Sequence, residues 1–465
     1  MLFHSFAFVA LLIPTLLVYW LAAGSRTVRL GALLAASMVF YAYHHWPSLF
    51  LLLGTIAVNY TAARFQERRR SRPLLAGVVL FDLSLLFWFK YAGFVSSQLV
   101  LLAAAVGLRL PLPELSPWLP LGISFFTFQV IAYQVDVYRG TVPAERSLLV
   151  FAVFKSFFAQ LIAGPIVRAK DFLPQLRERP RFDPARFHHG LFLFFAGMAL
   201  KIGLADVLRE FADEAFRDPA NLPTTDAWLG IYAFAVQLFS DFWGYSTMAR
   251  GLGELFGLEL PVNFDLPYLS ASLQEFWRRW HITLSAWFRD YVYIPLGGNR
   301  AHRVRNAVVT MTLAGIWHGA GWSFILWGAI HGAWLALEGA WRNWRHGEAR
   351  PGTPPTGWGR VVRVLAVFHG VCLLWVLFRA PSLQVALVYL SRLLLPPYTG
   401  HGSVPETLAI WLIGFALLQG FLTRALHRER FLAWPSWAQV GLTSAMLIVA
   451  LGYGGQKYDF VYFAF

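Results

Sequence analysis

Charged residues are scarce in this 465-residue chain: only 14% of its residues are charged, whereas 57% are hydrophobic. Soluble globular domains carry about 25% charged residues. This shortage excludes an ordinary soluble domain, and many apolar runs approach the roughly 20 residues that a helix needs to span a bilayer. The sequence therefore predicts an integral membrane protein.

Cysteine is almost absent, because Cys372 is the single one and lies in an apolar run. The chain therefore has no disulfide framework and no cysteine-based metal site. Its histidine-rich region lacks the HExxH and CxxC patterns of metal sites, and the chain has no GxSxG nucleophile elbow. We expect no bound metal and no resident cofactor.

Acidic residues are fewer than basic ones, and the formal net charge is +14. The basic residues lie in short loops between apolar runs, the pattern of loops held on the cytoplasmic side, so no nucleic-acid partner is expected. Basic loops follow the first apolar run (Arg26, Arg29) and the third (residues 64–72). If both are cytoplasmic, the N-terminus is periplasmic. The first run lacks early Lys or Arg, so we interpret it as a retained helix and not a signal peptide.

The fold class expected from these runs is an all-α integral membrane protein. In a membrane every backbone polar group must be satisfied internally, which favours helices over open strands. The apolar runs indicate about 11–13 membrane-embedded helices. We find no internal repeat and no large soluble region, so we expect one polytopic domain over residues 1–465, with a catalytic core at about 120–340.

Several expected spans contain polar side chains. They are Asp82, Lys90, Gln129, Gln134, Asp136, Lys155, Gln160 and Asp241. One interpretation is buried pairing or snorkelling at helix ends. The other is that they collectively line a polar pathway or pocket, and the sequence leaves both open.

Within residues 272–334, His281, His318 and His331 lie among arginines and tryptophans, and a fourth histidine, His302, lies in the polar turn between them. Taken as one helix, residues 272–291 have an aromatic face and a polar stripe. The stripe contains Gln274, Arg278, His281, Ser285 and Arg289. This helix either lies in the membrane interface or lines a cavity with its polar stripe. The basic turn after it either fixes topology, which we favour, or meets the phosphates of a nucleotide-like donor.

His318 follows Trp317 and lies among Gly315, Gly319 and Gly321, where small residues allow close helix approach. His331 is thirteen residues further on, about 220° around an ideal helix, so the spacing disfavours a metal pair. A buried histidine tends to stay neutral. A neutral imidazole can take a proton from a hydroxyl, which is the role of a general base in acyl transfer.

Segments along nearly the whole chain resemble the membrane-bound O-acyltransferase family, in the branch that contains the membrane subunit of alginate O-acetyltransferase. They include LPLGISFFTFQVIAYQVDVYRG, FFAQLIAGPIVR, QLFSDFWGYSTMARG, FWRRWHITLSAWFRDYVYIPLGGNR and IWHGAGWSFILWGAIHG. The resemblance implies tilted helices around a central catalytic funnel.

The resemblance also implies roles for individual residues. His318, in the WHG motif, matches the family's invariant histidine, and His281 matches its second polar position. We therefore predict His318 and His281 as catalytic. Trp317, Arg278, Ser285 and Asp241 are the predicted substrate-binding residues.

The function implied is O-acyl transfer in a bacterial inner membrane. The expected reaction moves acetyl from cytoplasmic acetyl-CoA to a hydroxyl of an exported polysaccharide, or to a periplasmic acceptor protein of the SGNH type. Membrane lipids surround the chain. One alternative is D-alanyl transfer from a carrier protein. Another is a polytopic transporter, although the missing repeat counts against it.

Overall fold

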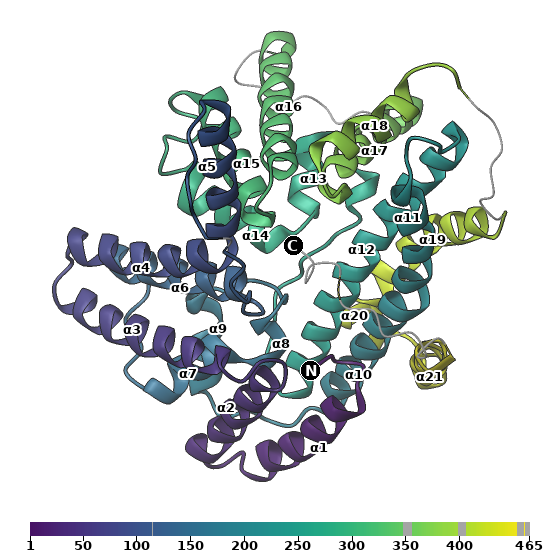
Figure 1. Cartoon of the computed structure of the whole chain (residues 1–465). Helices are drawn as coiled ribbons and strands as arrows, with labels where there is room; N and C mark the ends of the chain where they lie inside the picture. The colour runs from purple at the N-terminus through teal and green to yellow at the C-terminus, as the bar shows by residue number, and fades with distance from the viewer. Residues whose placement is uncertain (114, 347–355, 399–405, 453–459, 461–465) are drawn as a thin grey trace. The chain divides into compact units, whose positions relative to one another are not determined.

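A computed structural model of the chain describes residues 1–113, 115–346, 356–398, 406–452 and 460 (Figure 1). The secondary structure in these ranges is helical, without strands, as predicted for backbone in a membrane. The residues group into two compact units, described separately below. The first is Met1–Phe194 with Ser246–Pro261, and the second is Phe195–Tyr245 with Val262–Phe465.

The first unit contains the N-terminal helices. They are α1 (Phe6–Leu21), α2 (Arg26–Ala42), α3 (Ser48–Arg68), α4 (Arg72–Lys90), α5 (Ala92–Ala105), α6 (Ile123–Arg139), α7 (Leu148–Ser156), α8 (Phe158–Leu161), α9 (Ala169–Arg177) and most of α10 (Pro184–Met198). Serines begin several of them, because a serine hydroxyl can accept from an unpaired N–H of the first turn. Ser5, Ser25 and Ser71 cap α1, α2 and α4 in this way.

Buried polar side chains of the first unit pair with one another across neighbouring helices. The Asn59 amide on α3 donates to Asp82 on α4 at 2.9 Å, and Gln134 on α6 donates to the Asn59 Oδ1 at 3.0 Å. The three helices lie side by side in Figure 1. Pairing inside the helix bundle, one of the two interpretations left open, is therefore confirmed for Asp82 and Gln134.

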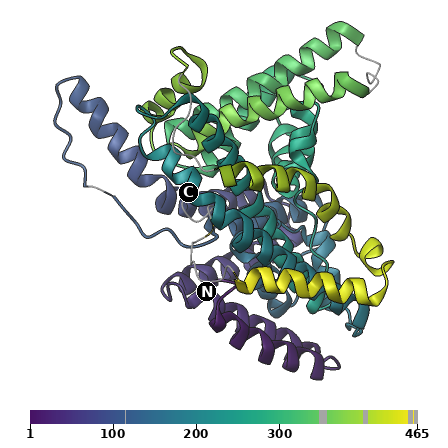
Figure 2. The same cartoon turned by 90° about the vertical axis from the view of Figure 1, so that its right-hand side faces the viewer.

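The second unit contains the remaining helices. They are the π-helix η1 (Ala199–Ala205), α11 (Asp206–Arg217), most of α12 (Thr224–Leu255), η2 (Pro267–Leu269), α13 (Leu273–Arg279), α14 (Ile282–Phe288), η3 (Arg289–Tyr293), α15 (Arg303–His318), α16 (Trp322–His346), α17 (Gly357–Arg379), α18 (Leu383–Leu394), α19 (Glu406–Ala425), α20 (Arg428–Leu432) and α21 (Ser436–Gly452). Figure 2 shows α16 and α17 as an adjacent pair.

A buried ion-pair cluster lies where η1 faces α12. The Lys201 ammonium contacts the Asp206 carboxylate at 2.5 Å and the Asp241 carboxylate at 2.8 Å, and all three residues are buried. Gly244 lets the backbones approach there, since a Cβ on it would lie 2.7 Å from the Gly197 carbonyl oxygen. Buried charges are expected to be paired in this way.

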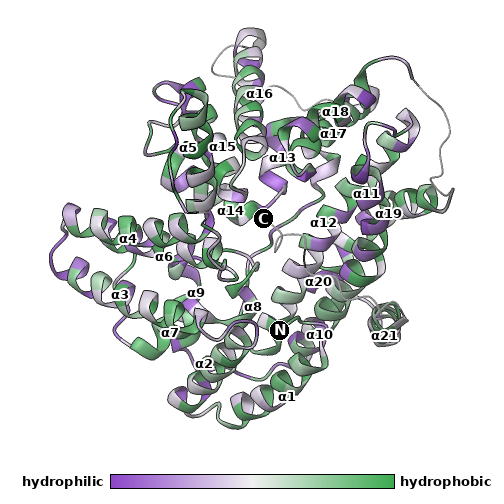
Figure 3. Cartoon of the chain, in the orientation of Figure 1, coloured by the Kyte–Doolittle hydropathy of each residue, from purple (hydrophilic) through white to green (hydrophobic). Residues whose placement is uncertain are grey.

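Four described helical segments are long and apolar enough to cross a membrane. They are Ser48–Arg68, Arg72–Lys90, Pro184–Arg217 and Gly357–Arg379. A bent pair of segments within α19 would make a fifth. Apolar residues run along helices such as α4, whereas hydrophilic residues gather at α13 (Figure 3). The multi-pass membrane prediction is confirmed, and the total of 11–13 embedded helices stays a prediction.

The apolar run at residues 149–166 does not form one continuous helix. α7 ends at Ser156, Phe157 leaves helical geometry with ψ 115°, and the four-residue α8 follows. The Phe158 N–H is satisfied outside the helix, by the Ser37 hydroxyl of α2 at 3.2 Å. A partner distant in sequence therefore ends a helix that the apolar pattern would continue.

Candidate functional site

The helices α15 and α16 form the base of the histidine region, and glycines set their spacing. A Cβ on Gly315 would lie 2.2 Å from the Phe324 carbonyl oxygen, and one on Gly328 would lie 2.3 Å from that of Met311. A Cβ on Gly332 would lie 2.6 Å from the Val308 Cα. Such distances are too short for any side chain, so the two backbones are in direct contact, as small residues allow.

His318 is the last residue of α15 and is 3% exposed. Gly319 ends the helix in an extended conformation, with φ −164° and ψ 155°. The imidazole is surrounded by aromatic rings, with ring centres 4.9 Å from Trp317, 5.2 Å from Trp327 and 5.1 Å from Phe378. The cluster excludes bulk water from the ring and fixes its orientation.

The single helix expected for residues 272–291 is wrong. α13 ends at Arg279, Trp280 is extended, and His281 has φ 43° in the left-handed region before α14 begins. Positive φ is uncommon for residues other than glycine and is often found at functional sites.

The break is stabilised by Asn263, eighteen residues upstream. Its carbonyl oxygen accepts from the Ile282 N–H at 2.9 Å, and its side-chain Oδ1 accepts from the Thr283 N–H at 3.2 Å. These are unpaired N–H groups of the first turn of α14, which a helix must satisfy from outside itself. Asn263 therefore supplies from a distance the cap that the local sequence lacks.

The same Asn263 oxygen fixes the tautomer of His281. The His281 Nδ1 lies 3.2 Å from Oδ1, which already accepts from a backbone N–H and is therefore the oxygen of the amide. Since an oxygen only accepts, Nδ1 carries the proton, and Nε2 carries the basic lone pair. Burial lowers the pKa of His281 to about 3, so the ring is neutral at physiological pH.

Trp317 brings the two predicted catalytic histidines into one ring cluster. Its ring centre is 4.9 Å from that of His318 and 6.1 Å from that of His281. Phe242 of α12 packs edge-on against His281 at 4.6 Å. Two buried imidazoles, one of them with a defined basic nitrogen, therefore lie against a single indole.

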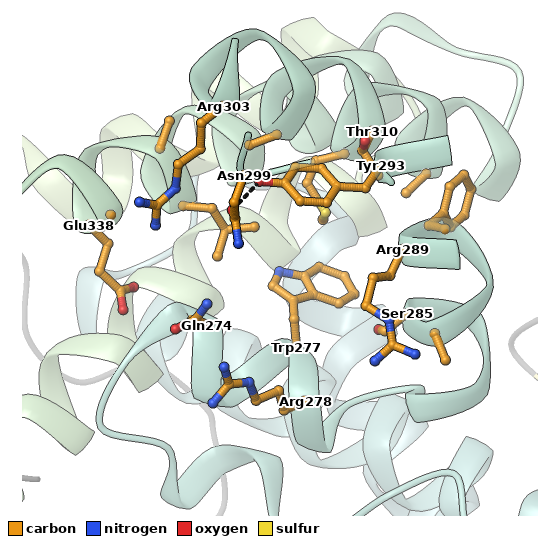
Figure 4. A pocket seen from close by; sticks show the side chains of 18 of the residues that line it. Gln274, Trp277, Arg278, Ser285, Arg289, Tyr293, Asn299, Arg303, Thr310 and Glu338 are labelled. Carbon is orange, nitrogen blue, oxygen red and sulfur yellow. Dashed lines mark hydrogen bonds between the residues drawn. The ribbon is translucent and has the colours of Figure 1, made fainter. Parts of the chain in front are cut away.

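A pocket of about 460 Å³ is shown in Figure 4, and its lining includes Ile282, the residue after His281. Its lining comes from α13, α14, η3, α15, α16 and the turn before α15. The polar and aromatic lining residues are Gln274, Trp277, Arg278, Ser285, Phe288, Arg289, Tyr293, Asn299, Arg303, Thr310, Glu338 and Arg342. Four arginines and one glutamate line the pocket, and Arg289 is paired with Asp290 at 2.8 Å. The lining keeps an excess of positive charge, which suits an anionic ligand.

The pocket lies on the His318 face of α15. Its lining includes Ala307, Thr310 and Ala314, and His318 is one helical turn beyond Ala314 on the same face. On α16, Leu335 lines the pocket, and His331 is one turn before it. The faces of both helices that line the pocket therefore lead, one turn further along each helix, to His318 and His331.

The structure separates the predicted polar stripe into two groups. Arg278 and Ser285 line the pocket, together with Gln274 and Arg289, whereas His281 is fully buried and is not in the lining. The helix break at His281 rotates it away from the other four. The assignment of Arg278 and Ser285 to substrate binding stays a prediction.

Asp241 lies in the Lys201 ion-pair cluster and outside the pocket lining. Arg303 and Arg342 were not among the predicted site residues, although the basic turn before α15 was a signal for the first. Trp277 was expected only as part of the aromatic face of residues 272–291, and His331 had no predicted role. No group of three or more His, Cys, Asp or Glu in the described part of the chain is arranged to hold a metal ion.

Comparisons with known proteins agree on one family. The model of MBOAT, the membrane-bound O-acyltransferase family, matches residues 144–374, which contain the whole pocket and both catalytic candidates. The "Probable alginate O-acetylase AlgI" of Pseudomonas aeruginosa is 43% identical over 395 residues, 83% of this chain and 73% of that protein. The peptidoglycan O-acetyltransferase of Helicobacter pylori is 36% identical, covering 77% and 72%. The teichoic acid D-alanyltransferase of Streptococcus thermophilus is 30% identical, covering 56% and 68%.

Proposed function

Since this chain belongs to the membrane-bound O-acyltransferase family, we propose that its O-acyltransferase reaction moves an acetyl group from acetyl-CoA to a hydroxyl of an exported polysaccharide. Relatives named as an alginate O-acetylase and a peptidoglycan O-acetyltransferase support acetyl as the group and a carbohydrate polymer as the acceptor. The observation that carries the proposal is the meeting of His281 and His318 at Trp317.

The proposed chemistry needs a base and a water-poor site. A neutral imidazole takes the proton of the acceptor hydroxyl, the oxygen attacks the thioester carbonyl, and the carbon–sulfur bond breaks. The thiolate of coenzyme A leaves and takes up the proton. His318 acts as base or nucleophile, and His281 assists through its Nε2, which the bond to Asn263 keeps unprotonated.

The basic pocket is the proposed donor site. Coenzyme A carries a pyrophosphate and a ribose phosphate, and arginine binds phosphate through charge-assisted hydrogen bonds. Arg278, Arg289 and Arg303 surround the pocket in Figure 4, with Trp277 in the middle of the view. The thioester end would then reach along α15 toward His318.

The proposed orientation follows the basic loops. The donor is cytoplasmic, the membrane is the bacterial inner membrane, and the N-terminus is periplasmic. The polymer acceptor is exported, so the acetyl group crosses the membrane through the protein. A periplasmic acetyltransferase of the SGNH type is the proposed partner where transfer to the polymer takes two steps.

A second donor is a thioester on a carrier protein. The similarity to a teichoic acid D-alanyltransferase favours it, since that protein aligns with 56% of this chain at 30% identity. The two donors differ in what the pocket must bind. If acetyl-CoA is the donor, free coenzyme A should inhibit transfer by competing for the pocket. If an acylated carrier protein is the donor, the unloaded carrier protein should be the competitor.

The test of catalysis uses membranes that contain the protein and labelled acetyl-CoA. Wild-type membranes should transfer label to polysaccharide, His318→Ala should abolish transfer, and His281→Ala should reduce it strongly. The matched control is His427→Ala, an exposed histidine outside the pocket, which should transfer normally. Full transfer by His318→Ala would refute the proposal.

The test of the donor site removes positive charge. The double change Arg303→Gln and Arg342→Gln should raise the KM for acetyl-CoA by about tenfold, because each lost charged contact weakens phosphate binding. Acetylpantetheine, which has no phosphate, should show the same KM in both proteins. The control is Arg424→Gln, an exposed arginine of α19. An unchanged KM for acetyl-CoA would exclude this pocket as the donor site.

A further inference from the structure

We propose that His331 is a positioning residue for this reaction, because it holds the Trp277 indole that joins the basic pocket to the rings around His318. The inference rests on the proposed function, in which the pocket receives the donor. It gives a role to His331, which spacing alone had set apart from His318.

The contacts form a continuous series from the pocket to His318. Trp277 lines the pocket, and its indole N–H donates to the His331 Nδ1 at 3.4 Å. The rings of Trp277 and His331 are 5.2 Å apart and nearly perpendicular. Trp327 packs against both histidines, with ring centres 4.7 Å from His331 and 5.2 Å from His318. Three aromatic side chains, Trp277, His331 and Trp327, thus connect the donor pocket with the proposed base His318.

The hydrogen bond has a defined direction. An indole nitrogen can only donate, so the His331 Nδ1 must be the acceptor and its proton must lie on Nε2. The bond therefore exists only with neutral His331. Trp277 is partly exposed on the pocket side, so rotation of its ring is opposed mainly by this bond and by ring packing.

His331 is itself held firmly. It is fully buried, and the next residue, Gly332, places the α16 backbone directly against Val308 of α15. Trp327 is also fully buried, one turn earlier on the same helix. The His331 Nδ1 therefore has a fixed position relative to α15. Through the hydrogen bond it also fixes the position of the Trp277 indole on the short helix α13.

The consequence for the reaction is orientation more than affinity. Most of the wall that Trp277 gives the pocket remains when only its N–H is lost. The Trp277 ring is then no longer held in one orientation, so the thioester that packs against it is held less precisely relative to His318. Misplacement of reacting groups lowers the rate of the chemical step. We therefore expect effects on kcat that exceed those on the KM for the donor.

The experiment compares four variants of the full chain. Trp277→Phe removes the donor but keeps an aromatic wall, and His331→Leu removes the acceptor at similar volume. Both should lower kcat about fivefold, with KM for acetyl-CoA changed less than twofold. The double variant should also lose about fivefold, because the same bond is lost. His331→Asn keeps an acceptor oxygen near the Nδ1 position and should stay within twofold of wild type.

Two results would overturn the inference. One is multiplicative losses, about twenty-five-fold in the double variant, which would mean that the residues act independently. The other is an equal loss in His331→Asn and His331→Leu, which would assign the histidine to packing alone. A merely structural role would not produce both the rescue by Asn and the non-additive double variant.

The same variants are compared for thermal unfolding in detergent, a measurement that needs no substrate. Non-additive stability losses in Trp277→Phe and His331→Leu would support the bond, and additive losses would contradict it. If wild-type membranes do not use acetyl-CoA at all, the proposed function fails, while the unfolding series still decides whether His331 holds Trp277.

Discussion

Replacing Asn263 with leucine tests the structural account of His281 most directly. Leucine has nearly the shape of asparagine but offers no oxygen. In the native protein the Asn263 Oδ1 accepts from the His281 Nδ1 at 3.2 Å, from the Thr283 N–H at 3.2 Å and from the Thr283 hydroxyl at 2.9 Å. Asn263 is 1% exposed, so water cannot take over these bonds.

The expected loss follows from the three bonds. A typical intramolecular hydrogen bond stabilises a protein by about 1 kcal/mol, so Asn263→Leu should lower the free energy of unfolding by about 3 kcal/mol. Thr283→Val, which removes only the hydroxyl, should cost about 1 kcal/mol. Release of His281 from its tautomer and orientation should also slow acetyl transfer about fivefold, the kinetic equivalent of about 1 kcal/mol.

The assay is unfolding in mixed micelles titrated with sodium dodecyl sulfate, run beside acetyl transfer in membranes. Asn263→Asp is the informative companion, because a carboxylate keeps the acceptor while its charge favours protonated His281. Stability of Asn263→Leu within about 0.5 kcal/mol of wild type would refute the capping role. A large stability loss with an unchanged transfer rate would show that the orientation of His281 does not matter to catalysis.

Three further changes have defined outcomes. Gly328→Ala should sharply lower the yield of folded protein in gel filtration, since its Cβ would lie 2.3 Å from a backbone carbonyl oxygen, whereas Gly441→Ala, in open space, should not. Lys201→Met should lower the free energy of unfolding by about 3–5 kcal/mol, because two buried carboxylates lose their cation; unchanged stability would contradict this. Because burial lowers the pKa of His281 to about 3, the unfolded chain binds the proton first, and stability should fall as pH drops below 6.5; unfolding of His281→Asn across pH should lack this component.

The helices of this chain were largely predictable, because long apolar runs in a membrane leave the backbone little choice but to form helices. The apolar runs at residues 306–317 and 322–341, for example, lie within α15 and α16. The predicted helix boundaries were wrong where a hydrogen-bond partner from elsewhere in the chain ends a helix. Ser37 does so after α7, and no local pattern announces it.

The site was predictable in its residue types more than in its geometry. The resemblance to a known family picked out His318 and His281, and the glycines around His318 correctly indicated close helix contact at Gly315. Helical periodicity wrongly placed His281 in the polar stripe, because periodicity considers only residues within one helix. The two oxygens of Asn263, eighteen residues upstream, accept the hydrogen bonds of Ile282 and Thr283 that a continuous helix would have made internally. The tautomer of His281 follows from that contact and from nothing in the local sequence.

The glycine contacts between α15 and α16 also decide which parts of the site can move. Backbones that touch at three glycines, one on α15 and two on α16, cannot slide without clashing, so this helix pair behaves as one rigid body. His318 and His331 are therefore carried on a fixed frame. The other wall of the pocket comes from α13 and α14, two seven-residue helices joined at the left-handed His281. Any shift of α13 against α14 in the proposed reaction would therefore also move the His281 imidazole, which lies at the joint between them.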